Sequence, residues 1–252
     1  MAQPPRTVEL ERCDSTQDEL RLLAHAGAPA FTVVRADVQY AGRGRRGRSW
    51  HTRPGAAMLA SVLLRPQRPA SELSGLAIVG GVAAARVARG LGVDARIRWP
   101  NDVVVGGRKL AGVLAELIDG PAILLGVGIN ADAGLEDLPE TDGLPPTSLR
   151  LEGARPATLS ELAALLVSEL RPLCERFDAG GFTAVRGDAE ELDALRGLEL
   201  ELALAGGETV RGSARGFADD GALVLDTADG PQQHRSGVVA RVRGGSLRQS
   251  PA

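Results

Sequence analysis

The sequence predicts an α+β protein that is followed by a small all-β domain. Three segments have the apolar pattern of helices, and short runs of strand-forming residues separate them. From about Leu198 the pattern changes to short strands that alternate with turns, which is typical of a small β-barrel. The chain has 252 residues, of which 44% are hydrophobic, so it is long enough for one large and one small domain. We therefore predict two domains, residues 1–185 and residues 186–252.

The chain opens with a predicted helix and two predicted strands. Residues 14–19 form a helix start in which Thr16 and Glu19 fit a capping box. A strand follows at residues 31–39, and the apolar run 58–64 is typical of a buried strand. The segment between them, residues 41–48, is a loop of Gly and Arg.

Residues 71–91 are rich in Ala, Leu and Val and contain no Pro, which predicts a buried helix whose regularity Gly80 and Gly81 weaken. Four short strands follow at residues 95–99, 103–105, 110–117 and 122–127, and then a polar loop at residues 132–146. Residues 158–177 are a predicted amphipathic helix that Thr158 and Glu161 cap, with Pro172 expected to kink or shorten its last turn. Turn signals in the C-terminal part lie at residues 206–207, 219–221 and 229–231.

Composition excludes several classes of protein. The net charge of -3 points neither to nucleic acid nor to an anionic membrane. No run reaches the roughly 18 apolar residues that span a bilayer, and the N-terminus lacks the apolar core of a signal peptide. Cys13 and Cys174 lie far apart, as in proteins of a reducing compartment, and the three His have no structural zinc spacing. We expect a cytoplasmic protein without a metal site of its own.

Lys109 is the only lysine among 29 basic residues, and the rest are Arg. Arg is a rigid planar fork, whereas Lys is a compact charge on a flexible stem. The exception suggests a position that needs an ammonium group. The plainer explanation is chance, because a strong bias toward Arg still leaves an occasional Lys. The neighbouring residues have to decide whether Lys109 has a function.

The loop at residues 42–48 carries four Arg and no acid, and it also reads G-x-G-x-x-G. A dinucleotide-binding fingerprint would require a helix after the loop and an acid about 20 residues on. A strand follows instead, and the first acid is Glu72, so that interpretation fails. Three interpretations remain: a loop that wraps a phosphate-bearing small molecule, a nucleic-acid patch, or a solvated basic loop. Gln39, Tyr40 and Trp50 flank the loop, and such side chains can line a pocket for a flat ligand.

A second polar cluster, Arg98-Trp99-Pro100-Asn101-Asp102, lies at a predicted turn between strands. Asp102 at this position can steer Mg²⁺ together with substrate phosphates, or it can simply bond its own turn. Lys109 opens the strand beside that turn.

Taken in order, these motifs resemble the biotin–protein ligases over roughly residues 8–178. Each motif is moderately specific, and the ordered set is highly specific. The C-terminal strands resemble the small SH3-like domain of that family. The motifs are Ser15-Thr16-Gln17, Gln39-Tyr40-Ala41-Gly42-Arg43-Gly44-Arg45-Arg46-Gly47-Arg48-Ser49-Trp50, Arg98-Trp99-Pro100-Asn101-Asp102, Arg108-Lys109-Leu110-Ala111-Gly112-Val113-Leu114-Ala115-Glu116 and Gly126-Val127-Gly128-Ile129-Asn130, with Thr147-Ser148-Leu149 after them.

The resemblance implies a fold and an activity. The fold would be a mixed sheet flanked by helices, as in class II synthetase and biotin–lipoate ligase catalytic domains. The activity would be activation of biotin with ATP and Mg²⁺ to biotinyl-5′-adenylate, followed by transfer to a lysine of the biotin carboxyl-carrier domain of a carboxylase. The carrier's identity, the role of the C-terminal domain and the choice between monomer and homodimer stay open.

The resemblance also implies roles for individual residues. Lys109, Arg45 and Asp102 would serve the chemistry, with Lys109 where the biotin carboxylate meets the α-phosphate. Biotin contacts would come from Ser15, Thr16, Gln17 and Gln39, and the loop that closes over the adenylate from Arg43, Gly44 and Arg45. The nucleotide and metal side would be formed by Trp50, Asn101, Asp102 and Asn130, and Gly112 would also border the ligands.

Two positions depart from the family pattern, because Arg98 replaces the usual Lys and Gln17 the usual Asn. The first motif begins near residue 14, which leaves no room for the DNA-binding helix-turn-helix of many bacterial relatives, so we expect no DNA binding. The rival within the superfamily is a lipoate or octanoate ligase, against which the full Gly/Arg loop and the Trp-Pro-Asn-Asp turn argue. A nucleic-acid-binding module is the rival from another class, and net charge argues against it.

Overall fold

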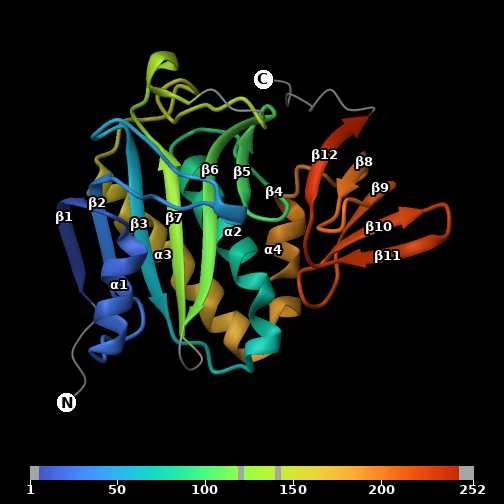
Figure 1. Cartoon of the computed structure of the whole chain (residues 1–252), viewed down its shortest axis with the longest axis horizontal. Helices are drawn as coiled ribbons and strands as arrows, with labels where there is room; N and C mark the ends of the chain where they lie inside the picture. The colour runs from blue at the N-terminus through green and yellow to red at the C-terminus, as the bar shows by residue number, and fades with distance from the viewer. Residues whose placement is uncertain (1–5, 119–121, 140–142, 244–252) are drawn as a thin grey trace.

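The computed structural model describes residues 6–118, 122–139 and 143–243. Seven strands form a mixed sheet in the order β1-β2-β3-β7-β6-β5-β4, in which β1 and β2 are parallel and the other neighbours are antiparallel (Figure 1). The predicted mixed sheet with flanking helices is therefore confirmed. The strands are β1 (Thr7–Cys13), β2 (Val33–Gln39), β3 (Ala57–Leu64), β4 (Arg96–Arg98), β5 (Asp102–Val105), β6 (Arg108–Ile118) and β7 (Ala122–Asn130).

Helices α2 (Leu76–Gly90) and α3 (Leu159–Gly180) cover one face of this sheet, and α1 (Thr16–His25) lies on the other (Figure 1). Every residue of β3 is buried, as the apolar run predicts. The predicted strand at 122–127 continues to Asn130. Shorter helical turns are η1 (Arg45–Gly47), η2 (Ala70–Gly75), η3 (Leu135–Asp137), η4 (Phe182–Ala184) and the one-and-a-half-turn α4 (Arg186–Glu191).

The helix ends agree only partly with the sequence. Thr158 and Glu161 form the predicted capping box at the start of α3. The expected box at Thr16 is wrong, because Ser15 caps α1 by accepting a hydrogen bond from the backbone of Gln17. Pro172 does not shorten its helix, since α3 runs on to Gly180, and the alternative of a kink at Pro172 stays a prediction. Thr16 is instead inside the helix, with its side chain free for another use.

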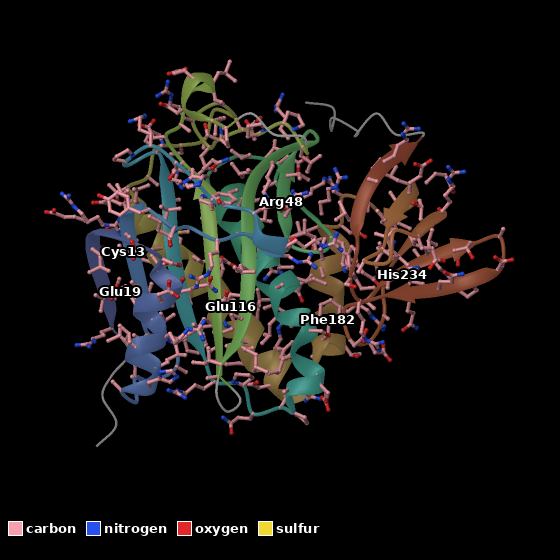
Figure 2. The ribbon with its side chains drawn as sticks, viewed as in Figure 1. Cys13, Glu19, Arg48, Glu116, Phe182 and His234 are labelled. Atoms are coloured by element: carbon pink, nitrogen blue, oxygen red, sulfur yellow. The ribbon has the colours of Figure 1, made fainter. Side chains whose placement is uncertain are left out.

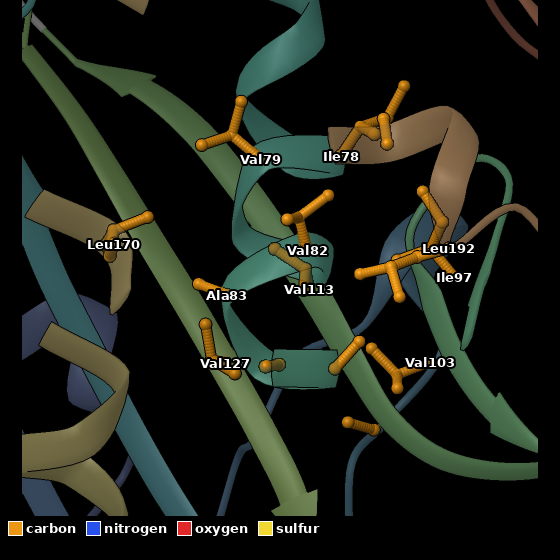
Figure 3. Close-up of a cluster of buried hydrophobic side chains, with 14 of the residues drawn as sticks. Ile78, Val79, Val82, Ala83, Ile97, Val103, Val113, Val127, Leu170 and Leu192 are labelled. Atoms are coloured by element: carbon orange, nitrogen blue, oxygen red, sulfur yellow. The ribbon is translucent and has the colours of Figure 1, made fainter. Parts of the chain in front are cut away.

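Neither Gly80 nor Gly81 interrupts α2. The absence of a side chain at Gly80 lets the helix lie close to the sheet. A Cβ on Gly80 would stand 2.9 Å from Val113 and 3.1 Å from Leu125, which is closer than carbon atoms pack. Figure 3 shows how Val79, Val82 and Ala83 of this helix meet Val113 and Val127 of β6 and β7. Gly80 therefore permits close helix–sheet packing that outweighs its low helix propensity.

One stretch, Ala70–Gly90, is long and apolar enough to cross a membrane by length and composition, although the sequence analysis found none. Two thirds of that window is buried inside the protein, against the sheet and α3. The composition of this stretch is therefore accounted for by its place in the core.

The C-terminal strands form a separate antiparallel sheet, which confirms the predicted all-β unit. Its order is β11-β10-β9-β8-β12. The predicted turns at residues 206–207, 219–221 and 229–231 lie at the successive connections from β8 to β11. The strands are β8 (Glu199–Ala203), β9 (Thr209–Phe217), β10 (Leu223–Thr227), β11 (Gly230–His234) and β12 (Val238–Arg243).

The two sheets are joined by close contacts. Phe182 and Phe217 meet edge to face with ring centroids 5.9 Å apart. The connecting segment adds to the first sheet, because Ile97 of β4 bonds through its backbone to Leu192 and Ala194. The boundary between residues 185 and 186 stays a prediction.

Asp193 lies in this connecting segment and is 7% exposed. Its Oδ1 accepts a hydrogen bond from the backbone of Leu195, while its Oδ2 is buried without a partner. Burial raises the pKa of Asp193 from 3.8 to about 6, against the lowering effects of that hydrogen bond and of Arg196. Near neutral pH the junction therefore holds a buried carboxylate whose charge is incompletely compensated.

We expect Asp193→Asn to stabilise the protein above pH 6 and to have little effect near pH 4. A carboxyl whose pKa is raised by folding adds stability below its unfolded pKa and loses it as pH rises through the folded pKa. The shift corresponds to about 3 kcal/mol at most, since one unit is worth about 1.4 kcal/mol. Urea unfolding of both proteins at pH 4 and pH 8 measures this, and an equal difference at the two pH values would contradict it.

Candidate active site

Strand alternation places a row of glycines on the sheet face opposite α2 and α3. Ile123, Leu125, Val127 and Ile129 of β7 belong to the main core. The intervening positions of β7 therefore face the other way, and Gly128 pairs directly with Gly112 of β6. Two neighbouring strands therefore carry no side chain at the centre of this face, which leaves space for a side chain from another segment.

Trp50 lies over that glycine pair. A Cβ on Gly128 would stand 2.7 Å from Trp50 Cε2, and one on Gly112 would stand 2.9 Å from Cζ3. The indole Nε1 is buried without a hydrogen-bond partner among the described residues. Trp50 is thus set into the face by the loop that precedes it, whose Gly42 carbonyl accepts from the Trp50 backbone at 2.8 Å.

Lys109 and Asp102 form the charged centre of this face. Asp102 begins β5 and Lys109 is the second residue of β6, so the β5–β6 hairpin brings them together. Lys109 Nζ lies 2.7 Å from Asp102 Oδ1 and 5.4 Å from the centroid of the Trp50 ring. The ammonium group therefore contacts both a carboxylate and an aromatic face.

Arg45 adds a second cation beside them. Its Nη1 donates to Asn101 Oδ1 at 3.2 Å, and Asn101 Nδ2 in turn donates to the Val113 carbonyl at 2.8 Å. Burial lowers the pKa of Arg45, and the charge of Arg46 lowers it further, whereas Asp102 opposes both. The cluster thus has more positive than negative side chains, which suits it to a polyanionic ligand.

A buried polar cluster lies at the start of α1. Gln39 Oε1 accepts from the Thr16 backbone at 2.7 Å and from Thr16 Oγ1 at 3.0 Å. Thr16 Oγ1 also lies 2.8 Å from Ser61 Oγ, and Ser61 is fully buried in the apolar strand β3. Ser15 is buried beside them as the cap of α1. These groups form a buried polar cluster beside the apolar side chains of β3.

The side chain of Gln17 is directed into the sheet. Its Nε2 donates to the carbonyls of Leu114 and Leu124, both at 3.2 Å. A Cβ on Gly126 would stand 3.1 Å from Gln17 Cδ, so the glycine makes room for the longer side chain. With both amide protons used, Gln17 offers a ligand only its Oε1.

Arg43 is held away from the charged centre by two acids. Its guanidinium makes paired 2.8 Å bonds to both oxygens of Asp18, and Nη2 lies 3.5 Å from Glu116 Oε2. Arg21 reaches the same Glu116 oxygen at 2.9 Å. We call these four residues the Arg43 clasp; Figure 2 labels its Glu116 on β6. The hydrogen bond from Arg43 lowers the pKa of Asp18.

The loop and β6 enclose a cavity of about 690 Å³. Leu114 and Glu116 line its floor, and the loop from Tyr40 to Ser49 lines the rest, together with His51. Gly44 pairs through its backbone with Arg48, and Arg46 adopts a left-handed φ of 57°. A non-glycine residue at such a φ is strained, so the contacts of the surrounding loop have to hold Arg46 in this conformation.

Asn130 supports the backbone around Lys109. Its Nδ2 donates to the Thr147 carbonyl at 2.8 Å and contacts the Lys109 carbonyl at 3.5 Å. The Thr147 backbone donates to the same Lys109 carbonyl. The side-chain amide of Asn130 is therefore engaged with the backbone around Lys109.

The structure brings the sequence-predicted residues into two groups on one face. The first group contains Lys109, Asp102, Asn101, Arg45, Trp50, Gly112 and Asn130, and the second contains Ser15, Thr16, Gln17 and Gln39. Gly42 connects them, since a Cβ there would lie 3.1 Å from Gln39 Nε2 and 2.4 Å from the Trp50 carbonyl. Arg43 lies apart, in its clasp.

Sequence reasoning missed Ser61, Asp18 and Glu116. Ser61 had a usable signal, because it is the one hydroxyl in an otherwise apolar strand. Asp18 was taken only as part of a helix start, and Glu116 only as part of a family motif. Neither has a local pattern that points to Arg43, which is 25 and 73 residues away along the chain.

We expect the loop to be cut by trypsin in the free protein and protected by biotin with ATP. Repulsion between Arg45 and Arg46 is relieved when phosphates arrive, whereas the clasp holds only one end of the loop. Asp18→Ala should speed cleavage of the free loop up to about fivefold, because an exposed pair is worth about 1 kcal/mol at most. Glu19→Ala, in the same helix, is the control. Equal cleavage with and without ligands would count against ligand-driven closure.

Comparisons with known proteins agree with this arrangement. Residues 9–132 match the Biotin/lipoate A/B protein ligase family, and residues 200–242 match the Biotin protein ligase C terminal domain. The Biotin--[acetyl-CoA-carboxylase] ligase of Paracoccus denitrificans is 35% identical over 232 residues, which cover 88% of this chain and 95% of that protein. The Bifunctional ligase/repressor BirA of Escherichia coli is 34% identical over 221 residues, and the chain spans 64% of its length.

Among solved structures, the biotin protein ligase of Aquifex aeolicus in complex with biotin and ATP has a TM-score of 0.78 and 26% identity. The alignment covers 92% of this chain and 96% of that one, so both sheets are included. With both family models matched and a relative of nearly equal length at 35% identity, this chain belongs to the biotin protein ligase family.

Proposed function

We propose that this protein activates biotin with ATP to biotinyl-5′-AMP and then transfers biotin to a lysine of a biotin carboxyl-carrier domain. The observation that carries the proposal is the pairing of a buried polar cluster with a cationic centre on one sheet face. The hydroxyl and amide groups of Thr16, Gln39 and Ser61 can hydrogen-bond the polar ring of biotin. The Lys109 and Arg45 charges are suited to a carboxylate that meets a phosphate.

In the first step a carboxylate oxygen of biotin attacks the α-phosphorus of ATP. A new P–O bond forms while the bond to pyrophosphate breaks, so two anions have to approach each other. Lys109 supplies preorganised positive charge at that point, and its flexible stem can follow charge between carboxylate and phosphate oxygens. Arg45 supplies a second charge from the loop.

In the second step the neutral amine of the carrier lysine attacks the acyl carbon. A C–N bond forms, the C–O bond to AMP breaks, and the amine proton is released. Until then the mixed anhydride has to be kept from water, and we propose that the loop from Tyr40 to Ser49, which lines the cavity, covers it. We propose that the ring of Trp50 borders the adenine of ATP.

Mg²⁺ fits this site as a companion of the substrate phosphates. Among the described residues no three His, Cys, Asp or Glu side chains gather to hold a metal alone. Asp102 is the carboxylate nearest the charged centre, and one carboxylate with substrate phosphates is a usual Mg²⁺ environment. Bound there, Mg²⁺ would neutralise charge on the pyrophosphate leaving group.

Gln17 and Asn130 receive narrower roles than the resemblance implies. Because both side chains donate to backbone carbonyls, we propose that Gln17 positions the strands beside bound biotin and that Asn130 positions the backbone around Lys109. Ser15, Arg43, Gly44 and Gly112 are proposed to border the ligand. A cytoplasmic location and a monomeric or homodimeric state remain predictions.

Lipoate or octanoate is the alternative acyl substrate. The similar relatives are biotin ligases by name, which supports biotin. The test of transfer is incubation with biotin, ATP, Mg²⁺ and a purified carrier domain, followed by streptavidin capture. Capture of the carrier, and none of a carrier whose lysine is replaced by Arg, is expected. Modification of a lipoyl domain with lipoate instead would overturn the assignment.

A further inference from the structure

Arg98 occupies the junction between the two sheets. It is the last residue of β4, the edge strand of the large sheet, and it pairs directly with Asp102 across the β4–β5 hairpin. Its Nη2 donates to the carbonyl of Val239 in β12 at 3.0 Å. β12 is itself the edge strand of the C-terminal sheet, and it lies beside β4 in Figure 1. One side chain therefore links the edge of the C-terminal sheet to the hairpin that carries Asp102.

The surroundings of Arg98 make this link consequential. Burial lowers the pKa of Arg98, and Asp102 opposes the effect. The guanidinium has five N–H donors in a fixed fork, so the bond to Val239 leaves donors that point elsewhere. Asp102 meanwhile contacts Lys109. A shift of β12 would change the position of Arg98 and so the field at Asp102 and Lys109.

The main chain of β4 is held from the same side. Leu192 and Ala194, in the segment that leads to the C-terminal sheet, bond to both backbone groups of Ile97 at 2.8 Å. The strand pairing of β12 with β8 is irregular at Val239, because its register shifts between Val239 and Arg241. The C-terminal domain thus contacts the active-site hairpin through both backbone and side chain.

We propose that Arg98 is a positioning residue that couples docking of the C-terminal domain to ATP binding, through Val239 on one side and Asp102 on the other. The expected effect on ATP binding rests on the proposed function. The structural link between β12 and the β4–β5 hairpin does not. A lysine at this position has one ammonium point and no fork, so it would keep the charge near Asp102 but not the guanidinium geometry of the bond to Val239.

The kinetic test measures ATP–pyrophosphate exchange driven by biotin, in a double-mutant cycle. Arg98→Met is expected to raise KM for ATP about tenfold or more, the scale of one charged hydrogen bond, with KM for biotin nearly unchanged. Phe217→Ala, which loosens docking at the Phe182–Phe217 contact away from the site, is expected to raise KM for ATP in the parent but not in the Arg98→Met background. Additive effects would overturn the coupling.

Two further variants keep the test decisive. Arg98→Lys should recover part of the ATP affinity that Arg98→Met loses, without recovering the sensitivity to Phe217→Ala. Full recovery of both would mean that the positive charge alone matters, which would overturn the coupling through the guanidinium. Should Phe217→Ala unfold, Ser74→Ala replaces it, since Ser74 Oγ donates to the Asp220 carbonyl at the same docking surface.

Hydrogen exchange gives a readout that needs no activity. Arg98→Met is expected to speed amide exchange both in β12 and in residues 99–102, and unchanged exchange in either segment would overturn the proposal. A parent protein without biotin-dependent exchange would refute the proposed function, whereas a normal parent with an unaffected Arg98→Met variant would refute only the coupling.

Discussion

Lys109→Ala is expected to slow biotin adenylation by about 100- to 1000-fold, which is the loss measured when one preorganised donor is removed from a transition state. Lys109 Nζ lies 2.7 Å from Asp102 and over the Trp50 ring, so its position is fixed before ligands arrive. Its removal takes away positive charge where two anions must meet, and it leaves Asp102 to repel them. Single-turnover formation of biotinyl-5′-AMP measures the effect.

Lys109→Arg is the matched control for this prediction. It keeps the charge but replaces a compact ammonium with a larger fork, in a space where Gly112 lies close to the Lys109 side chain. We expect an intermediate rate. Normal adenylation by Lys109→Ala with an intact fold would remove Lys109 from the chemistry, and equal rates for Lys109→Arg and the parent would show that no ammonium is needed.

Gly128→Ala is expected to displace Trp50 and to lower adenylation about tenfold to a hundredfold, as a misplacement near 1 Å can do. The new Cβ would stand 2.7 Å from Trp50 Cε2, and the facing Gly112 leaves the ring no slack on the neighbouring strand. A moderate loss of stability, about 1–3 kcal/mol, should accompany it, because overpacking forces a rigid side chain to move.

The control for this substitution is Gly187→Ala in α4. No atom lies within 4 Å of a Cβ at Gly187, so alanine there should be neutral or slightly stabilising. Fluorescence of Trp50, separated from that of buried Trp99 by comparison with Trp50→Phe, reports the displacement. Normal adenylation with unchanged fluorescence in Gly128→Ala would mean that the glycine pair does not hold Trp50.

The sequence predicted the elements of the site better than the links between them. Strand periodicity, the run at residues 58–64 and the turn at residues 100–102 follow from local chemistry, and the structure confirms them. Lys109 stood out because its type is unique in the chain. That it would meet Asp102 follows from a hairpin only a few residues long.

Contacts between distant segments left no comparable pattern. The pairing of Arg43 with Asp18 and Glu116 depends on how α1, the loop and β6 come together in three dimensions. The reach of Arg98 to Val239 depends on how the second sheet docks. The Thr16 capping box failed for a related reason, since a tertiary bond to Gln39 and Ser61 replaced the local one.

The measurement that tests the central claim most directly is ATP–pyrophosphate exchange with Mg²⁺, compared for biotin, lipoate and octanoate. Exchange requires the adenylate to form and reverse, so it isolates the step assigned to the cationic centre. We predict exchange with biotin alone, lost in Lys109→Ala. Exchange with lipoate or octanoate in place of biotin would contradict the proposed substrate, and no exchange with any of the three acids would contradict the proposed function.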